Sequence, residues 1–377
     1  MANVETDVFY FKDDVGKNLY RKKTYYTLCI EQDVLADNKD EADQKFLDGG
    51  GIAHSKITKD ITDANEGVET FMVDANYTES DDTKFIGKVK YDTDTYNQTL
   101  DEAIERYFEL GWTDGLPVVP PTQDKVLEFV ENLGGDPDFV ECKVPPRWGG
   151  LSRGVLAVNM IMAGCKAEYA PVVRAAMLAL TDSKFNLNGV QATTHVAAPL
   201  LIVNGPIAAE IGMNGGANAF GSGNRANATI GRAIRLILLN VGGGRAPDLD
   251  KCTLGNPAKY TYCICENEQN SPFAPYHVEK GFSSKASTVF TIAAEAPHSV
   301  TDHQCNDPEG ILDTICSAMS NIASNTSVLS GHCTLALGLE HARTIAKYGW
   351  SRQDIKNYLW MHSGNKFSAH SRDHRYG

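Results

Sequence analysis

A short apolar run in the middle of the chain most constrains its fold. Residues 199–204 read Pro-Leu-Leu-Ile-Val-Asn, which is the length of one strand and offers no polar face. Such a strand is stable only when side chains cover both of its sides, so the sequence predicts a sheet with other layers packed against it. Helical and strand-like patterns alternate on either side of this run, which is typical of an α/β protein.

The predicted elements of the α/β body lie between residues 97 and 362. Helical periodicity marks residues 97–110, 123–133, 154–163, 170–180, 227–240, 308–323, 341–348 and 352–360. Strand-like runs occupy residues 199–204, 260–265, 288–293 and 334–339. We therefore predict a main α/β domain at 97–362, in which helices flank a layered sheet, followed by a polar tail at 363–377.

An excess of acidic residues is concentrated near the N-terminus. The chain has 35 Lys and Arg against 48 Asp and Glu, a net charge of −13, and residues 1–100 alone contain 12 basic and 21 acidic residues. Strand-like runs fall at residues 24–30, 55–61, 68–77 and 85–91, and a helical pattern falls at 38–47. The sequence thus predicts a small acidic α+β domain at 1–96, which we interpret as an accessory or assembly module.

Composition excludes several classes of protein. A chain without a basic field does not attract phosphate backbones, so we expect no nucleic-acid partner. No uncharged run approaches the roughly 18–20 residues of a membrane helix, and residues 1–7 lack the features of a secretory signal. Nine cysteines in 377 residues are too few for a disulfide scaffold. We expect a cytoplasmic protein that has no membrane partner and forms an oligomer.

A glycine-rich turn that runs directly into a predicted helix is the strongest local signal. Glycines permit close approach of the backbone, and the first amides of a helix bind anions with help from the helix dipole. Arginines can add forked hydrogen bonds to a carboxylate or phosphate. The candidate substrate-binding residues are Gly221, Ser222, Gly223, Asn224, Arg225, Asn227, Thr229 and Arg232. The alternative is a tight turn with asparagine caps, whose arginines form internal ion pairs.

Candidate catalytic residues follow the strand predicted at 260–265. Cys265 with Glu266 or Glu268 could act as a nucleophile and an acid, because ligands of α/β sheets gather outside the carboxyl ends of strands. His277 lies 12 residues after Cys265 and could serve as a base or a metal ligand. Strand alternation would place Cys263 and Cys265 on one face, where they could equally be small core residues.

Two further places could carry chemistry. Asp114 lies in a Pro/Gly-rich loop, where it could be a general base or a metal ligand, or could close an Asx turn. Cys165 precedes Lys166, whose charge would favour a thiolate, although its apolar flanks predict burial. A transition metal is the one cofactor that the sequence suggests, and its ligands are left open. A compact group of side chains would suit such a metal: His298, Asp302, His303 and Cys305.

Residues from about 111 to 360 resemble an uncharacterised bacterial family, the UGSC family (seleno)proteins, or a companion module of that family. The likeness is carried by the segments 111–122 (GWTDGLPVVPPT), 159–165 (NMIMAGC), 221–232 (GSGNRANATIGR), 340–342 (EHA) and 349–351 (GWS). The family name refers to a Cys/selenocysteine-Gly-Ser-Cys motif that this chain lacks, so the motif would lie on a separate partner or the likeness covers only the companion module. The resemblance implies thiol or selenol redox chemistry, or cleavage of a carbon–heteroatom bond, and carries over no catalytic residue.

Two functions remain open from the sequence. The first is an enzyme, or an enzyme subunit, that acts on a small anionic organic molecule as a lyase or oxidoreductase with help from a cysteine or a metal. The second is a non-catalytic binding or assembly subunit of a larger complex, in which the N-terminal domain docks a redox protein or another subunit. A pocket with converging polar groups at the glycine-rich turn would favour the enzyme, and a filled turn beside an exposed apolar patch would favour assembly.

Overall fold

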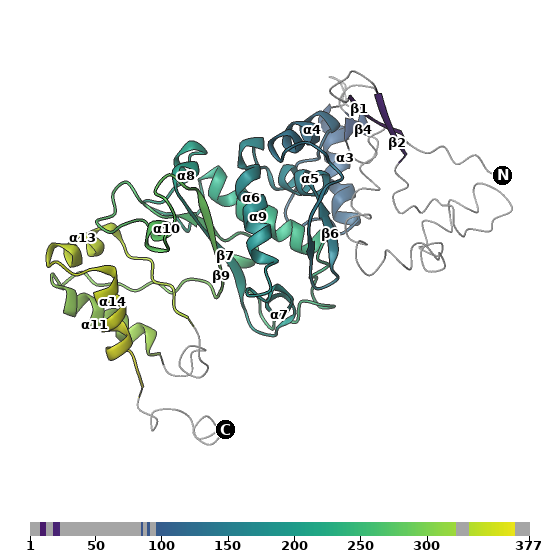
Figure 1. Ribbon diagram of the computed structural model, residues 1–377. Coiled ribbons are helices and arrows are strands. Elements are labelled where there is room, and N and C mark those ends of the chain that lie inside the picture. Colours follow the sequence, from purple (N-terminus) through teal and green to yellow (C-terminus); the bar gives the residue numbers. More distant parts are fainter. Residues whose placement is uncertain are drawn as a thin grey trace, which may run out of the picture. The chain divides into compact units, whose positions relative to one another are not determined.

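A computed structural model describes residues 96–321 and 332–365 of the chain, together with four short strands before them (Figure 1). These residues belong to two units. The first unit comprises Met1–Cys265 and Ser287–Ala296, and the second comprises Glu266–Ala286 and Pro297–Gly377. A division inside residues 97–362 was not predicted from the sequence.

A mixed three-stranded sheet forms the centre of the first unit, so the chain is an α/β protein with helices flanking its sheet. Strand β7 (Ala198–Asn204) lies between β8 (Cys263–Cys265), to which it is parallel, and β9 (Thr288–Ala294), to which it is antiparallel. Leu201 and Val203 enter the main apolar core on one face, while Ala198 and Leu200 join a smaller cluster on the other. The prediction that both faces of this strand are covered is therefore confirmed.

Helices supply most of the main core. The helices of this part are α3 (Tyr96–Glu109), α4 (Gln123–Asn132), α5 (Arg153–Ala163), α6 (Ala170–Leu180) and α9 (Arg225–Asn240). Every residue of α5 from Gly154 to Ala163 is buried, because α4, α6 and α9 all pack against it. Helices α6 and α9 also contact the sheet. Among the described residues, none of the helices combines the length and the apolarity that are needed to cross a lipid bilayer.

Several smaller elements of the first unit were not predicted. Strands β5 (Val140–Val144) and β6 (Gly149–Ser152) form an antiparallel hairpin, and α7 (Leu187–Ala192) and α8 (Pro206–Glu210) are short helices around β7. Near the N-terminus, β1 (Val8–Lys12) pairs with β2 (Asn18–Lys22), and β3 (Lys84–Phe85) pairs with β4 (Val89–Lys90). The single strand predicted at 85–91 is thus a tight antiparallel pair. The elements predicted at 24–30, 38–47, 55–61 and 68–77 lie outside the described residues.

The second unit is helical. Its elements are α10 (Tyr276–Glu279), α11 (Pro308–Met319), α13 (Leu339–Lys347) and α14 (Arg352–His362). Leu312, Ile345 and Leu359 meet in its core. The strand predicted at 334–339 is wrong, because residues 332–338 are irregular and Leu339 begins α13. An apolar run becomes a strand only beside a partner strand, and no sheet is present among the described residues of this unit.

Candidate functional site

The glycine-rich turn enters α9 through an asparagine cap, one of the two arrangements that the sequence left open. Asn224 is extended, and its Oδ1 accepts a hydrogen bond from the amide of Asn227 at 3.0 Å, while its Nδ2 donates to the carbonyl of Gly212 at 2.8 Å. The amides of Arg225 and Ala226, the first two of the helix, have no acceptor among the described residues. These two donors, at the positive end of the helix dipole, are what remains of the predicted anion site.

Asparagine side chains hold the turn in shape. The buried Asn227 donates from Nδ2 to the carbonyls of Asn214 (2.8 Å) and Ala219 (3.2 Å), and its Oδ1 accepts from the amide of Asn214. Asn218 donates to the carbonyl of Ser222 at 2.8 Å, and a Cβ at Gly221 would lie only 2.0 Å from Asn218 Oδ1. Asn227 therefore shapes the turn, whereas Gly221, Ser222 and Gly223 lie exposed on it.

Arg225 connects the start of α9 to the end of α5. Its Nε donates to the carbonyl of Gly164 at 2.9 Å, and its Nη2 lies 3.5 Å from the carbonyl of Cys165. Gly164 ends α5 in the left-handed region, at φ +89°, so its carbonyl is one that the helix itself leaves without a partner. The guanidinium of Arg225 stays exposed at the surface beside the turn.

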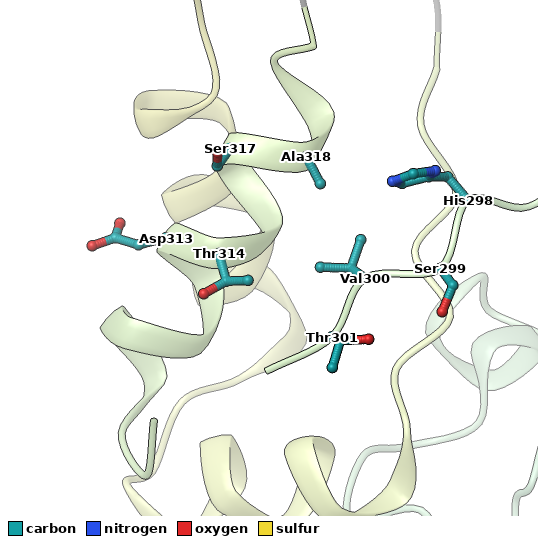
Figure 2. Close-up of a pocket in the computed structure, with 8 residues that line it drawn as sticks. All are labelled: His298, Ser299, Val300, Thr301, Asp313, Thr314, Ser317 and Ala318. Atoms are coloured by element: carbon teal, nitrogen blue, oxygen red, sulfur yellow. The ribbon is translucent and has the colours of Figure 1, made fainter. Parts of the chain in front are cut away.

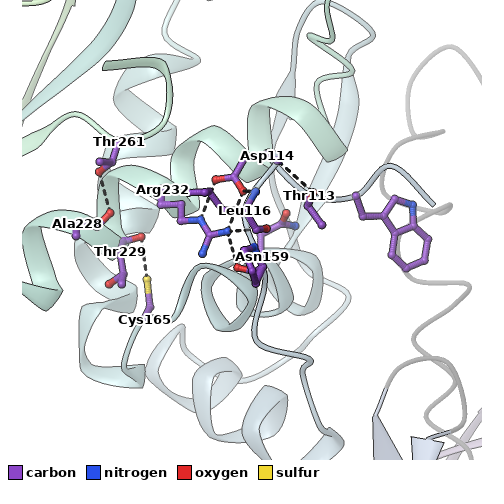
Figure 3. Close-up of polar contacts among 12 residues, drawn as sticks. Thr113, Asp114, Leu116, Asn159, Cys165, Ala228, Thr229, Arg232 and Thr261 are labelled. Atoms are coloured by element: carbon purple, nitrogen blue, oxygen red, sulfur yellow. Dashed lines mark hydrogen bonds and ion pairs between the residues drawn. The ribbon is translucent and has the colours of Figure 1, made fainter. Parts of the chain in front are cut away.

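Arg232 and Asp114 form an ion pair inside the first unit (Figure 3). Arg232 Nε and Nη2 each lie 2.8 Å from an oxygen of Asp114, and Nη2 also donates to the carbonyls of Leu116 (3.2 Å) and Pro117 (2.8 Å). The side chain of Asp114 is 2% exposed and that of Arg232 is 17% exposed. Asp114 Oδ1 also accepts from the amide of Leu116, which closes an Asx turn. Asp114, the predicted base, and Arg232, the predicted anion ligand, thus pair with each other. Both are structural residues that hold the 111–117 loop against α9.

The cysteines near α9 are buried thiols. Cys165 Sγ donates to the carbonyl of Thr229 at 3.3 Å (Figure 3). Thr229 Oγ1 donates back along the helix to the carbonyl of Arg225. Burial raises the pKa of Cys165 to about 12, although the contact with Thr229 and the charge of Arg225 partly oppose it. Burial also raises the pKa of Cys263. Both thiols therefore remain protonated at neutral pH, which does not suit a nucleophile.

Alkylation tests this directly. At pH 8 we expect iodoacetamide to modify Cys165 and Cys263 in the folded protein at least about 100-fold more slowly than the exposed Cys333, because only the thiolate reacts. Peptide mass spectrometry after timed quenching measures the three rates separately. Denaturation in guanidinium chloride should make the rates comparable. Rapid labelling of Cys165 in the folded protein would contradict the assignment.

The residues predicted after β8 belong to both units. Cys265 is the buried last residue of β8 and lies with Cys263 in the main core of the first unit, as strand alternation predicts. Glu266 begins the second unit. Its Oε2 accepts from the amide of Tyr276 at 2.7 Å and its Oε1 from Arg352 Nη2 at 2.8 Å. Glu266 therefore orients α10 and α14, and its carboxylate is occupied by these contacts.

His277 is the predicted site residue with the least ordinary surroundings. It lies on α10 and is 2% exposed, yet neither ring nitrogen has a hydrogen-bond partner in the described part of the chain. Its Nδ1 lies 3.7 Å from Glu268 Oε1. Buried imidazoles normally hydrogen-bond, because leaving a polar group dry and unpaired is costly. His277 and Glu268 are therefore two of the predicted residues whose ionisable atoms the structure brings near each other.

An ion-pair network beside α10 was not predicted from the sequence. Arg352, at the start of α14, donates to Glu266 and to Glu279 at 2.8 Å each, and Lys356 also bonds Glu279. Partial burial raises the pKa of Glu279, but the hydrogen bonds from Lys356 and Arg352 outweigh it and leave this pKa below its usual value. The spacing of Arg352 and Lys356, one helical turn apart, was the available signal.

The compact group predicted as metal ligands does not assemble. Asp302 accepts hydrogen bonds at 2.9 Å from the amides of Gln304 and Cys305 and from Thr314 Oγ1, and these bonds hold its pKa well below the usual range. Within residues 96–321 and 332–365, no three His, Cys, Asp or Glu side chains come together as metal ligands. The predicted transition metal therefore finds no site among these residues.

His298 instead borders an open hollow of about 560 Å³ in the second unit (Figure 2). In this view the His298 ring and the Ala318 side chain face the space between α11 and residues 298–301, and Asp313 points away from it. Asp313 accepts from Tyr358 Oη at 2.7 Å, which raises the pKa of Tyr358 to about 12. Half of the residues that line the hollow carry a hydroxyl group: Ser299, Thr301, Thr314 and Ser317.

Two features remain as candidates for function in the described part of the chain. One is the exposed turn at the start of α9, and the other is the His277–Glu268 pair. No protein-family model, curated protein or solved structure matches the chain. The geometry of these two features is therefore the basis for a functional proposal.

Proposed function

We propose that this chain is an enzyme, or a subunit of one, whose acid–base group is His277. The observation that carries the proposal is a buried imidazole that has no hydrogen bond within the described part of the chain and has a carboxylate 3.7 Å from its Nδ1. Such a carboxylate stabilises the imidazolium that forms when the ring takes up a proton. Because Glu268 lies on the Nδ1 side, Nε2 is the atom that exchanges a proton with a substrate.

The proposed substrate is a small anionic organic molecule, and the proposed reaction is that of a lyase or an oxidoreductase. Support for proton abstraction comes from His277. Removal of a proton next to a carboxylate or carbonyl group begins many elimination reactions, and it needs a positioned base of this type.

Hydrogen–deuterium exchange tests this proposal and does not require the product to be identified. The full-length protein is incubated in D₂O with a mixture of hydroxy, oxo and amino acids of small size, and proton NMR follows the signals of carbon-bound protons. We expect at least one acid to lose its α-proton signal, and His277→Gln to slow this loss by about 100-fold or more. Glu268→Gln should give an intermediate rate, because it removes only the carboxylate.

The matched control is His341→Gln in the same unit. His341 Nε2 lies 3.0 Å from the carbonyl of Asp302, so its ring has an ordinary partner and the exchange rate should stay unchanged. Circular dichroism verifies that each variant is folded. Equal exchange by the wild type and His277→Gln, or no exchange of any acid by the wild type, would contradict the proposal.

A second candidate function is a non-catalytic assembly subunit. Two observations at the turn before α9 favour it. The side chain of Asn227 fills the turn, and the exposed Phe220 has its ring centroid 6.3 Å from that of Tyr262. In this case Phe220→Ser would dissociate an oligomer, or release a second protein subunit, without affecting folding. Light scattering of the purified chain, alone and co-expressed with a second subunit, separates this function from catalysis.

A further inference from the structure

Strand β9 is an outer strand of the central sheet, and on one side it has no neighbouring strand among the described residues. Its seven residues, Thr288–Ala294, pair with β7 along their whole length without a bulge. The strand contains no charged residue, no proline and no glycine. Proteins commonly protect an edge strand with a charge, a proline or a bulge, because an unprotected edge pairs readily with another strand.

The register of the sheet shows which backbone groups of β9 point to its free edge. The amide of Leu201 in β7 donates to the carbonyl of Tyr262, so the backbone groups of Leu201 point toward β8. Leu201 lies opposite Thr291, and opposed residues of an antiparallel pair either exchange both hydrogen bonds or exchange none. The amide and carbonyl of Thr291 therefore point away from β7. Alternation along the strand places those of Val289 and Ala293 at the same edge.

These outward backbone groups have no hydrogen-bond partner in the described part of the chain. Ala293 is exposed, and Val289 and Thr291 are half-buried. Helix α6, which contacts β9, packs in the main core together with Val289, so it covers a face of the strand. A row of donors and acceptors at strand spacing is complementary to the backbone of another strand.

The sequence of β9 is complementary to itself. In an antiparallel pair of β9 strands about a two-fold axis at Thr291, this threonine lies opposite its own copy and Val289 lies opposite Ala293. Phe290 and Ile292, on the other face of the strand, also lie opposite each other. Every cross-strand pair is thus uncharged, and apolar pairs flank the axis on both faces of the sheet.

Charges beyond the ends of β9 favour the same arrangement. The first charged residue before the strand is Lys285, and the first one after it is Glu295, which also pairs with His195 at 3.0 Å within the chain. Antiparallel pairing brings the basic end of one strand to the acidic end of the other, whereas parallel pairing would bring like charges together. The partner that fits this edge is therefore a second copy of the chain.

We propose that the chain forms a dimer in which the β9 strands of two copies pair antiparallel at their free edges. The outward amides of each copy then donate to the outward carbonyls of the other, and the two three-stranded sheets become one continuous sheet. This surface differs from that around Phe220, because Phe220 contacts Tyr262 next to β8, on the other side of β7. The dimer does not depend on the role of His277.

Sedimentation of the full-length protein over a range of concentrations tests the dimer. We expect the wild type to dimerise and Thr291→Lys and Thr291→Glu each to raise the dissociation constant at least about tenfold, because like charges then meet at the two-fold axis. Mixing the two variants should restore a dimer with opposite charges at the axis. The control Leu254→Lys adds the same charge at a residue that is 90% exposed, and it should leave the dimer unchanged.

Three results would overturn the proposal. They are a folded wild type that stays monomeric at every concentration, a dimer that both Thr291 variants retain, and a dimer that Phe220→Ser dissociates but Thr291→Lys does not. Should the Thr291 variants fail to fold, amide hydrogen exchange of the wild type replaces them. Protection of the amides of Val289, Thr291 and Ala293 must then increase with protein concentration, and exchange that is independent of concentration refutes the pairing.

Discussion

Arg232→Met is expected to lower the free energy of unfolding by about 3–5 kcal/mol, because it leaves the buried carboxylate of Asp114 without its partner. The guanidinium makes two 2.8 Å bonds to that carboxylate and further bonds to the carbonyls of Leu116 and Pro117. One substitution thus removes both the counter-charge and the attachment of the loop to α9. Urea denaturation followed by circular dichroism measures the loss.

Arg225→Met is the matched control on the same helix. It removes an exposed guanidinium that bonds backbone carbonyls, so the expected loss is about 1 kcal/mol. Combining Arg232→Met with Asp114→Leu should recover much of the stability, since the unpaired charge is then also gone. If Arg232→Met proves no more destabilising than Arg225→Met, the ion pair with Asp114 does not stabilise the fold.

Gly231→Ala is expected to destabilise the protein by about 3 kcal/mol, although alanine is normally the better helix residue by about 1 kcal/mol. Gly231 is buried in the second turn of α9, where the helix approaches the segment that enters β8. An added Cβ would lie 2.4 Å from Thr261 Oγ1 and 2.6 Å from the amide nitrogen of Tyr262. Because a backbone atom is among the clashing atoms, the strand or the helix must move. Thermal denaturation would show the loss as a lower Tm.

Gly216→Ala provides the comparison for this substitution. Its Cβ would meet only Asn214 Oδ1 at an ordinary 3.5 Å, so the stability should change by less than about 1 kcal/mol. Equal Tm values for the two alanine variants would show that α9 can withdraw from the sheet without cost. A larger loss for Gly216→Ala than for Gly231→Ala would contradict the close packing of α9 against the start of β8.

Local patterns predicted the longer helices of the described residues well, but not the short helices α7, α8 and α10. The range predicted at 170–180 is that of α6, and the helix predicted at 227–240 is α9 with one further residue pair at its start. Apolar periodicity, capping side chains and helix-ending glycines all act within a few residues, so they are visible in the sequence. Strands were less well predicted. The run at 260–265 is paired only at Cys263–Cys265, because pairing depends on where β7 lies.

In the candidate site, too, local arrangements were predictable from the sequence and long-range contacts were not. Asn224 as the helix cap and Asp114 in an Asx turn were among the alternatives that the sequence offered, and both are local hydrogen-bond arrangements. The ion pair between Arg232 and Asp114 could not be predicted from the sequence, because the two residues are 118 positions apart. The contact between the β5–β6 hairpin and the end of α9, where the amide of Arg147 donates to the carbonyl of Gly242, was equally unpredictable because the two segments lie far apart in the sequence.

The sequence by itself therefore determined the α/β class, the course of the main helices and the residue types available for chemistry. Only the tertiary structure decided which charged and polar groups neutralise one another and which keep a free donor or acceptor. The reason is physical: helix formation depends on neighbours three and four residues away, whereas the partner of a buried charge is chosen by packing between distant segments. The sequence offered both His277 and Arg232 as candidate site residues. Packing left the imidazole of His277 without a hydrogen bond among the described residues, whereas it paired the guanidinium of Arg232 with Asp114.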